Sequence, residues 1–116
     1  MALLSRDDIL NADDLTIEAI AVPEWGGEVN VKTLTGAEKD KWETARARPD
    51  GSPNLQNVRG SIVSICVCDE EGKAIFTPKD VAALGKKSAR ALDRVLEKCK
   101  ELNGVTEGDL EELEKN

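Results

Sequence analysis

Two short runs of β-branched and small residues, separated by a pair of glycines, constrain the fold of this chain most. Residues 15–22 read Leu-Thr-Ile-Glu-Ala-Ile-Ala-Val, and residues 29–32 alternate apolar and polar side chains as a half-solvated strand does. The sequence Pro-Glu-Trp-Gly-Gly stands between them. Glycine supplies the positive φ that tight turns need. The pattern predicts an antiparallel β-hairpin with Trp25 at its tip.

Capping signals divide the rest of the chain into helices. Thr35 and Glu38 have the spacing of a capping box, and Pro78 follows Thr77 as proline does in the first turn of a helix. The expected helices are a short one after Ser5, one over residues 36–47, one over 55–68, a short one over 78–85, one over 88–102, and a short acidic one from Thr106 that carries Leu110 and Leu113. We expect the last of these, within residues 105–116, to fray.

Residues 62–68 fit two structures. Their run of apolar residues suits a buried strand, whereas Leu55 and Val58 extend a helical face through Ile62 and Ile65. We favour a helix because the periodic face is longer than a usual strand. With no alternation of strands and helices, the chain is predicted to be one α+β domain, residues 1–116, in which an N-terminal hairpin packs with several helices and the C-terminal half is helix-rich.

Composition excludes most catalytic chemistry. The chain has no histidine, so it lacks the imidazole base of Ser-His and Cys-His enzymes, and no phosphate-binding glycine motif is present. Paired carboxylates fall at expected turns, helix starts and the tail. We therefore expect no enzyme and no cofactor. The sequence also shows no signal peptide and no apolar run of membrane-span length, so we expect a cytoplasmic protein with no membrane partner.

The three cysteines, Cys66, Cys68 and Cys99, are expected to be reduced and buried. Structural zinc usually has four Cys or His ligands, and this chain offers at most three. We predict no metal site.

A basic stripe recurs every four residues along the helix expected over 88–102. Its members are Lys86, Arg90, Arg94 and Lys98. Such a stripe can contact phosphate, but acidic residues lie on the same helix and the net charge is −7. A face that is solvated or paired within the molecule is favoured, and we expect no nucleic-acid partner.

The two tryptophans have different expectations. Trp42 lies in the middle of a helix and is expected in the core. Trp25 either folds back as core or contacts a partner, since tryptophan is enriched at binding hot spots. Packing into the core is favoured by a small margin. The candidate partner-binding residues are Trp25 with Val29 and Val31 of the same hairpin.

Several stretches together resemble a known family. They are residues 22–38, which include Trp25-Gly26-Gly27 and the Thr35-to-Glu38 capping box, and residues 4–10, 69–77, 80–88 and 102–106. In this order they resemble the tail assembly chaperones of bacteriophages with long flexible tails. The resemblance covers nearly the whole chain and rests on overall pattern.

The resemblance implies a role in protein binding. It implies that the chain binds the tape measure protein in the host cytoplasm, keeps that long helical chain soluble, helps recruit tail tube protein, and is absent from the mature virion. It also implies self-association and a longer form made by ribosomal frameshifting. Glu114-Lys115-Asn116 is compatible with a slippery A-AAA-AAC run, through which an extended form would be made. The alternatives are a structural tail component, such as a tube or connector subunit, and a small regulatory binding protein.

Overall fold

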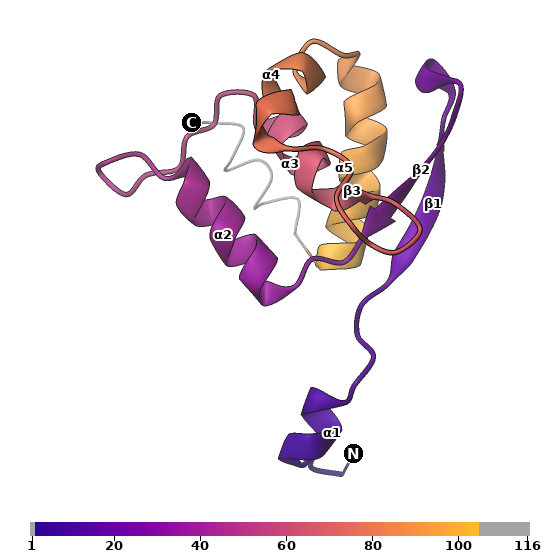
Figure 1. Cartoon of the computed structure of the whole chain (residues 1–116), viewed down its shortest axis with the longest axis vertical. Helices are drawn as coiled ribbons and strands as arrows, with labels where there is room; N and C mark the ends of the chain where they lie inside the picture. The colour runs from indigo at the N-terminus through magenta and orange to yellow at the C-terminus, as the bar shows by residue number, and fades with distance from the viewer. Residues whose placement is uncertain (1, 105–116) are drawn as a thin grey trace.

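The computed structural model describes residues 2–104, which form an α+β fold (Figure 1). The elements, in chain order, are α1 (Arg6–Leu10), β1 (Ile17–Val22), the 3-10 turn η1 (Pro23–Trp25), β2 (Gly27–Lys32), α2 (Gly36–Arg46), α3 (Val58–Cys66), β3 (Val67–Cys68), the 3-10 turn η2 (Pro78–Asp80), α4 (Val81–Leu84) and α5 (Ala89–Asn103). The predicted fold class is confirmed. The acidic helix expected within residues 105–116 lies outside the described residues.

The hairpin is the centre of a small antiparallel sheet with the order β1-β2-β3. Ile17 lies opposite Lys32 at one end of the hairpin, and Val22 lies opposite Gly27 at the other. Opposed residues of an antiparallel pair point to the same face. Ile20 and Val29, which are opposed, both pack against the hydrophobic core that α5 helps to build.

The stretch over residues 55–68 was predicted as one helix, and the structure corrects both ends. Leu55 lies before the helix, because Asn57 adopts a left-handed backbone conformation with φ of 54°. Such a conformation cannot continue a right-handed helix. The helix α3 ends at Cys66, and β3 pairs with β2 over the next two residues. Of the two structures considered for residues 62–68, the helix is therefore correct up to Cys66 and the buried strand is correct for Val67–Cys68.

The core lies between the sheet, α3 and α5. The apolar stripe expected on the last long helix is confirmed, since α5 buries Leu92, Val95, Leu96 and Cys99, while Leu102 is half-buried. Burial of one such aliphatic side chain stabilises the fold by about 1.5–3 kcal/mol. These side chains meet the valines that the sheet and α3 bury: Val22, Val31, Val63 and Val67.

The helix starts predicted at Thr35 and Ser5 are confirmed by their capping bonds. Thr35 Oγ1 accepts from the Glu38 amide at 3.1 Å, and the Glu38 carboxylate accepts from the Thr35 amide at 2.9 Å. Ser5 makes the same reciprocal pair with Asp8. Caps of this kind contribute about 1 kcal/mol each.

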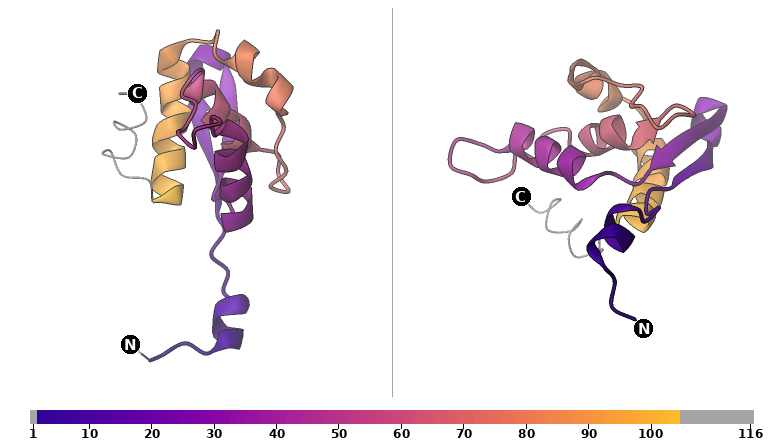
Figure 2. Two further views of the ribbon diagram at one scale, coloured as in Figure 1. Left: turned by 90° about the vertical axis from the view of Figure 1, so that its left-hand side faces the viewer. Right: turned by 60° about the horizontal axis from the view of Figure 1, so that its bottom comes forward.

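The first helix stands apart from the rest of the molecule. Figure 1 and the left-hand view of Figure 2 show α1 joined to β1 by an extended stretch and apart from the body. α1 buries none of its residues. Within residues 2–104, no helix combines the length and apolar character that a membrane span requires.

Candidate functional site

The hairpin tip is tighter than the sequence suggested. Pro23 opens the 3-10 turn η1 directly after β1, and Gly26 follows it with φ of 76°. Gly27 is already the first residue of β2 and pairs with Val22. Only one of the two glycines therefore uses the left-handed conformation, and Trp25 belongs to η1 rather than to an open loop.

An ion pair holds this tip against α5. The Arg94 guanidinium nitrogen Nε donates to both carboxylate oxygens of Glu24, at 2.8 and 3.1 Å. The hydrogen bond from Arg94 lowers the pKa of the Glu24 carboxyl, and the neighbouring charge of Arg90 acts in the same direction. A contact between residues 70 apart in the chain fixes where the tip points.

The three candidate partner-binding residues are placed differently. Trp25 is half-buried and packs against the core, as the favoured interpretation expected. Val29 is half-buried on the same side of the hairpin. Val31 is fully enclosed in the core and presents no surface to a partner. The apolar surface that this hairpin face offers to a partner therefore consists of the exposed parts of the Trp25 and Val29 side chains.

Two of the four residues of the basic stripe, Arg94 and Lys98 on α5, are paired within the molecule. Arg94 binds Glu24, and Lys98 lies 3.0 Å from Glu101 and 3.8 Å from Glu18 of β1. These contacts confirm the expectation of a paired face for Arg94 and Lys98. Most of the partners come from the hairpin, whereas the sequence pointed to acids on the same helix.

Trp42 corrects another expectation. It was predicted in the core, but α2 buries none of its residues and Trp42 is half-exposed. Its indole Nε1 donates to Ser61 Oγ of α3 at 2.8 Å, and the Arg46 guanidinium lies 5.6 Å from the ring centroid. The ring thus links α2 to α3 by a polar contact rather than by burial.

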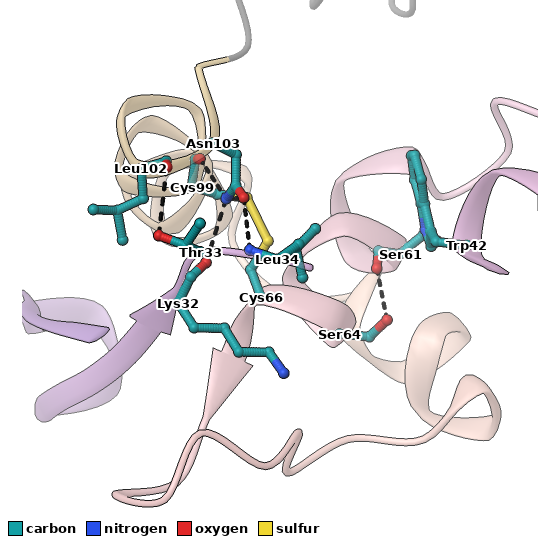
Figure 3. The surroundings of a disulfide bond; sticks show 10 residues. All are labelled: Lys32, Thr33, Leu34, Trp42, Ser61, Ser64, Cys66, Cys99, Leu102 and Asn103. Carbon is teal, nitrogen blue, oxygen red and sulfur yellow. Dashed lines mark hydrogen bonds between the residues drawn. A yellow bond between two sulfur atoms is a disulfide. The ribbon is translucent and has the colours of Figure 1, made fainter. Parts of the chain in front are cut away.

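A polar junction at the end of α5 was missed from the sequence. Asn103 Oδ1 accepts from the Leu34 amide at 2.7 Å, while Nδ2 donates to the carbonyls of Cys99, at 2.9 Å, and of Lys32, at 3.3 Å (Figure 3). These bonds join the exit of β2 to the end of α5. The sequence marked Asn103 only as a helix stop, because asparagine before glycine is common there.

Lys32 was expected on the solvated face of a strand, and the structure buries it. Its Nζ donates to Glu38 Oε2 at 2.6 Å and to the Gly72 carbonyl at 2.9 Å. Burial disfavours ionisation of Glu38, but hydrogen bonds from Lys32 and Thr35 outweigh it, so the pKa of the Glu38 carboxyl is lowered. The turn at Gly72 thus shields the Lys32 side chain from solvent.

The cysteines depart from the expectation of three reduced thiols. Cys66 of α3 and Cys99 of α5 form a disulfide (Figure 3). Cys68 is free and buried, and burial raises the pKa of its thiol. Over the described residues 2–104, no three His, Cys, Asp or Glu side chains gather in a way that could hold a metal ion.

Comparisons with known proteins add one informative likeness. No family model matches the chain, and no curated protein sequence matches it. Among solved structures, the chain is similar to the bacteriophage HK97 tail assembly chaperone, with a TM-score of 0.54 and 17% identity over 76% of this chain and 85% of that chain. The chain has a tail assembly chaperone-like fold. At this identity, the likeness concerns the fold alone, and it agrees with the family that the sequence resembles.

Proposed function

We propose that this chain is a non-enzymatic phage tail assembly chaperone. It binds the tape measure protein, keeps it soluble while the tail forms, and helps recruit tail tube subunits through a longer frameshifted form. It acts in the host cytoplasm and is absent from the mature virion. The observation that carries the proposal is the similarity of fold to the HK97 tail assembly chaperone across most of both chains.

The hairpin tip is the proposed contact with the tape measure protein. A chaperone for a long amphipathic helix needs apolar side chains that meet an i, i+3, i+4, i+7 stripe. Trp25 is a half-exposed aromatic whose position is fixed by the Glu24–Arg94 pair, and Val29 extends the same face. A held aromatic loses little conformational freedom on binding, which favours affinity.

The test is co-expression with a very long helical protein encoded by an open reading frame next to this gene. We expect that product to be soluble and to co-purify with the wild-type chain, and to precipitate without it. Trp25→Ala should reduce co-purification. Because the ring also packs against the core, the variant will melt at a lower temperature, so binding is compared at a temperature at which both proteins are fully folded. Trp42→Phe is the control, because it keeps a ring on α2, away from the hairpin. A long product that stays insoluble with the wild-type chain would refute the proposal.

The alternatives predict other results. A structural tail component would be found by mass spectrometry in purified virions, where this proposal expects none. A DNA-binding regulator would shift DNA in a salt-dependent assay. Pairing of Arg94 and Lys98 with acidic side chains speaks against the second alternative.

A further inference from the structure

The strand β1 lies at the edge of the sheet, with β2 on its inner side and no strand of residues 2–104 on its outer side. Figure 1 shows it along the outer margin of the molecule. Natural proteins commonly protect such an edge with proline, with lysine or by keeping the strand very short. β1 has six residues and contains neither proline nor lysine. Its backbone therefore offers an unprotected edge to another chain.

The pairing with β2 determines which backbone groups of β1 face outward. The Thr33 amide donates to the Thr16 carbonyl at 2.9 Å, so these two residues form a hydrogen-bonded pair just before the strand. Hydrogen-bonded and non-hydrogen-bonded pairs alternate along an antiparallel ladder. The even-numbered residues of β1 therefore direct their N–H and C=O groups to β2. The odd-numbered residues direct theirs to the free edge, and these are Ile17, Ala19 and Ala21.

The side chains along this edge leave room for another strand. Ile17, Ala19 and Ala21 are all exposed, and the two alanines are small. Side chains alternate between the two faces of a strand, so Ile20 and Val22 pack against the core instead. An added strand would thus bond to the backbone of β1 and place alternate side chains beside Ile17 and the alanines. In this mode of recognition, main-chain hydrogen bonds give affinity and the alternate side chains give specificity.

The charge around the edge indicates which strand it fits. Residues 13–28 contain five carboxylates and no lysine or arginine. Arg94 and Lys98 of α5 pair with two of them, Glu24 and Glu18. The other three are exposed and lie at both ends of the edge: Asp13 and Asp14 precede β1, and Glu28 lies opposite Ala21 near the tip. Two β1 edges paired with each other would bring like charges together, whereas a strand with basic ends is complementary.

We propose that the free edge of β1 binds an extended segment of another protein, with β-branched residues in its middle and lysine or arginine at both ends. The segment joins the three-stranded sheet beside β1 and bonds to the outward N–H and C=O groups of Ile17, Ala19 and Ala21. This contact differs from the one proposed for Trp25. An amphipathic helix uses its backbone groups within itself and has none to give to a sheet edge. The inference does not rest on the proposed function.

The test is binding of a short synthetic peptide to the purified full chain, measured by calorimetry. The probe alternates valine and threonine between lysines at both ends, and we expect it to bind more weakly as salt rises. Glutamates in place of the lysines should weaken binding by roughly tenfold or more. A probe that is N-methylated at every valine and threonine keeps its charge and side chains but donates no backbone bonds, and it should not bind. Failure of the lysine peptide to bind, or equal binding of the N-methylated one, would overturn the proposal.

Hydrogen exchange of the backbone amides shows where the peptide binds. In the free chain, the amides of Ile17, Ala19 and Ala21 should exchange readily because they face solvent, whereas β2 protects those of the residues between them. The lysine peptide should slow exchange of the three edge amides by roughly tenfold or more. Protection that appears elsewhere and leaves these three amides unchanged would overturn docking at β1.

A proline in the edge removes one of the proposed bonds. Ala19→Pro deletes an outward N–H and keeps the ladder with β2, since proline is tolerated where the N–H of an edge strand faces solvent. It should lower affinity for the lysine peptide by roughly tenfold or more. Ala19→Thr is the matched control, because it keeps the N–H and suits a strand, and it should bind as wild type does. An equal loss in both variants, or no loss in a folded Ala19→Pro, would contradict the proposal; if the proline variant does not fold, the exchange pattern of the wild-type chain decides.

Discussion

A close approach between α3 and α4 gives a quantitative prediction. Gly60 of α3 is buried against α4. A Cβ placed on Gly60 would lie 2.9 Å from the Val81 carbonyl oxygen, 3.0 Å from the Gly85 amide nitrogen and 3.2 Å from Leu84 Cβ. Two of these atoms belong to the backbone and cannot turn aside by a change of rotamer. Gly60→Ala must therefore move α4 away from α3.

Two opposing effects set the size of the change. Alanine is about 1 kcal/mol more favourable than glycine inside a helix. Overpacking of a tight contact typically costs about 1–3 kcal/mol. Because backbone atoms receive the new methyl group, we expect the upper part of that range and a net loss of about 1–2 kcal/mol in the free energy of unfolding. For a domain of this size, each kcal/mol lowers the melting temperature by about 4–8 °C.

Gly36→Ala is the matched control. Gly36 begins α2, its φ is not positive, and a Cβ there would meet no atom within 4 Å. This variant should be neutral or more stable by up to about 1 kcal/mol. Urea denaturation followed by circular dichroism measures both. If Gly60→Ala were as stable as Gly36→Ala, the close packing of α3 on α4 would be refuted.

Three other predictions concern the polar and covalent links. Asn103→Ala should cost about 1–3 kcal/mol, because it leaves the Leu34 amide without its acceptor; urea denaturation beside Glu97→Ala, an exposed change on the same helix, checks this. The lowered pKa of Glu38 means that its stabilisation is present above its ordinary value of 4.5 and is lost as pH falls through the folded-state pKa. The stability difference between wild type and Glu38→Gln should therefore shrink below about pH 4.5, and equal differences at pH 7 and at low pH would contradict it. Reduction of the disulfide, which joins residues 33 apart, should lower the free energy of unfolding by about 4 kcal/mol, measured in denaturant with and without dithiothreitol.

Local signals predicted much of the fold. The caps at Thr35 and Ser88 and the apolar stripe of α5 need only neighbouring residues to form, and the structure has all three. The start of α3 was predicted wrongly because the left-handed backbone of Asn57 interrupts the helix, although the apolar periodicity of the sequence continues past Asn57. The prediction that Lys32 is solvated was wrong because the turn at Gly72, 40 residues away in the chain, covers its side chain. Long-range packing decides these positions, and no local pattern encodes it.

The candidate site was predicted less well, for the same reason. The sequence pattern assigns both Trp25 and Val31 to the hairpin as candidate contacts. Only the packing of the folded chain shows that the ring is half-exposed and that the valine is fully enclosed. The sequence also gave no sign that Leu4 and Ile9 would stay uncovered. Whether an apolar residue near a chain end is buried depends on the rest of the molecule offering a matching surface.

The hairpin face that we propose as the partner contact is small, because Glu24 and Arg94 hold Trp25 against α5. Most of the exposed large apolar side chains of residues 2–104 lie instead in residues 3–17. Variants of each region separate their roles. If a variant with Leu4→Ser and Ile9→Ser still keeps the long helical partner soluble and Trp25→Ala does not, partner binding belongs to the hairpin. If the pattern is reversed, residues 3–17 bind the partner, because their apolar side chains suit an amphipathic helix.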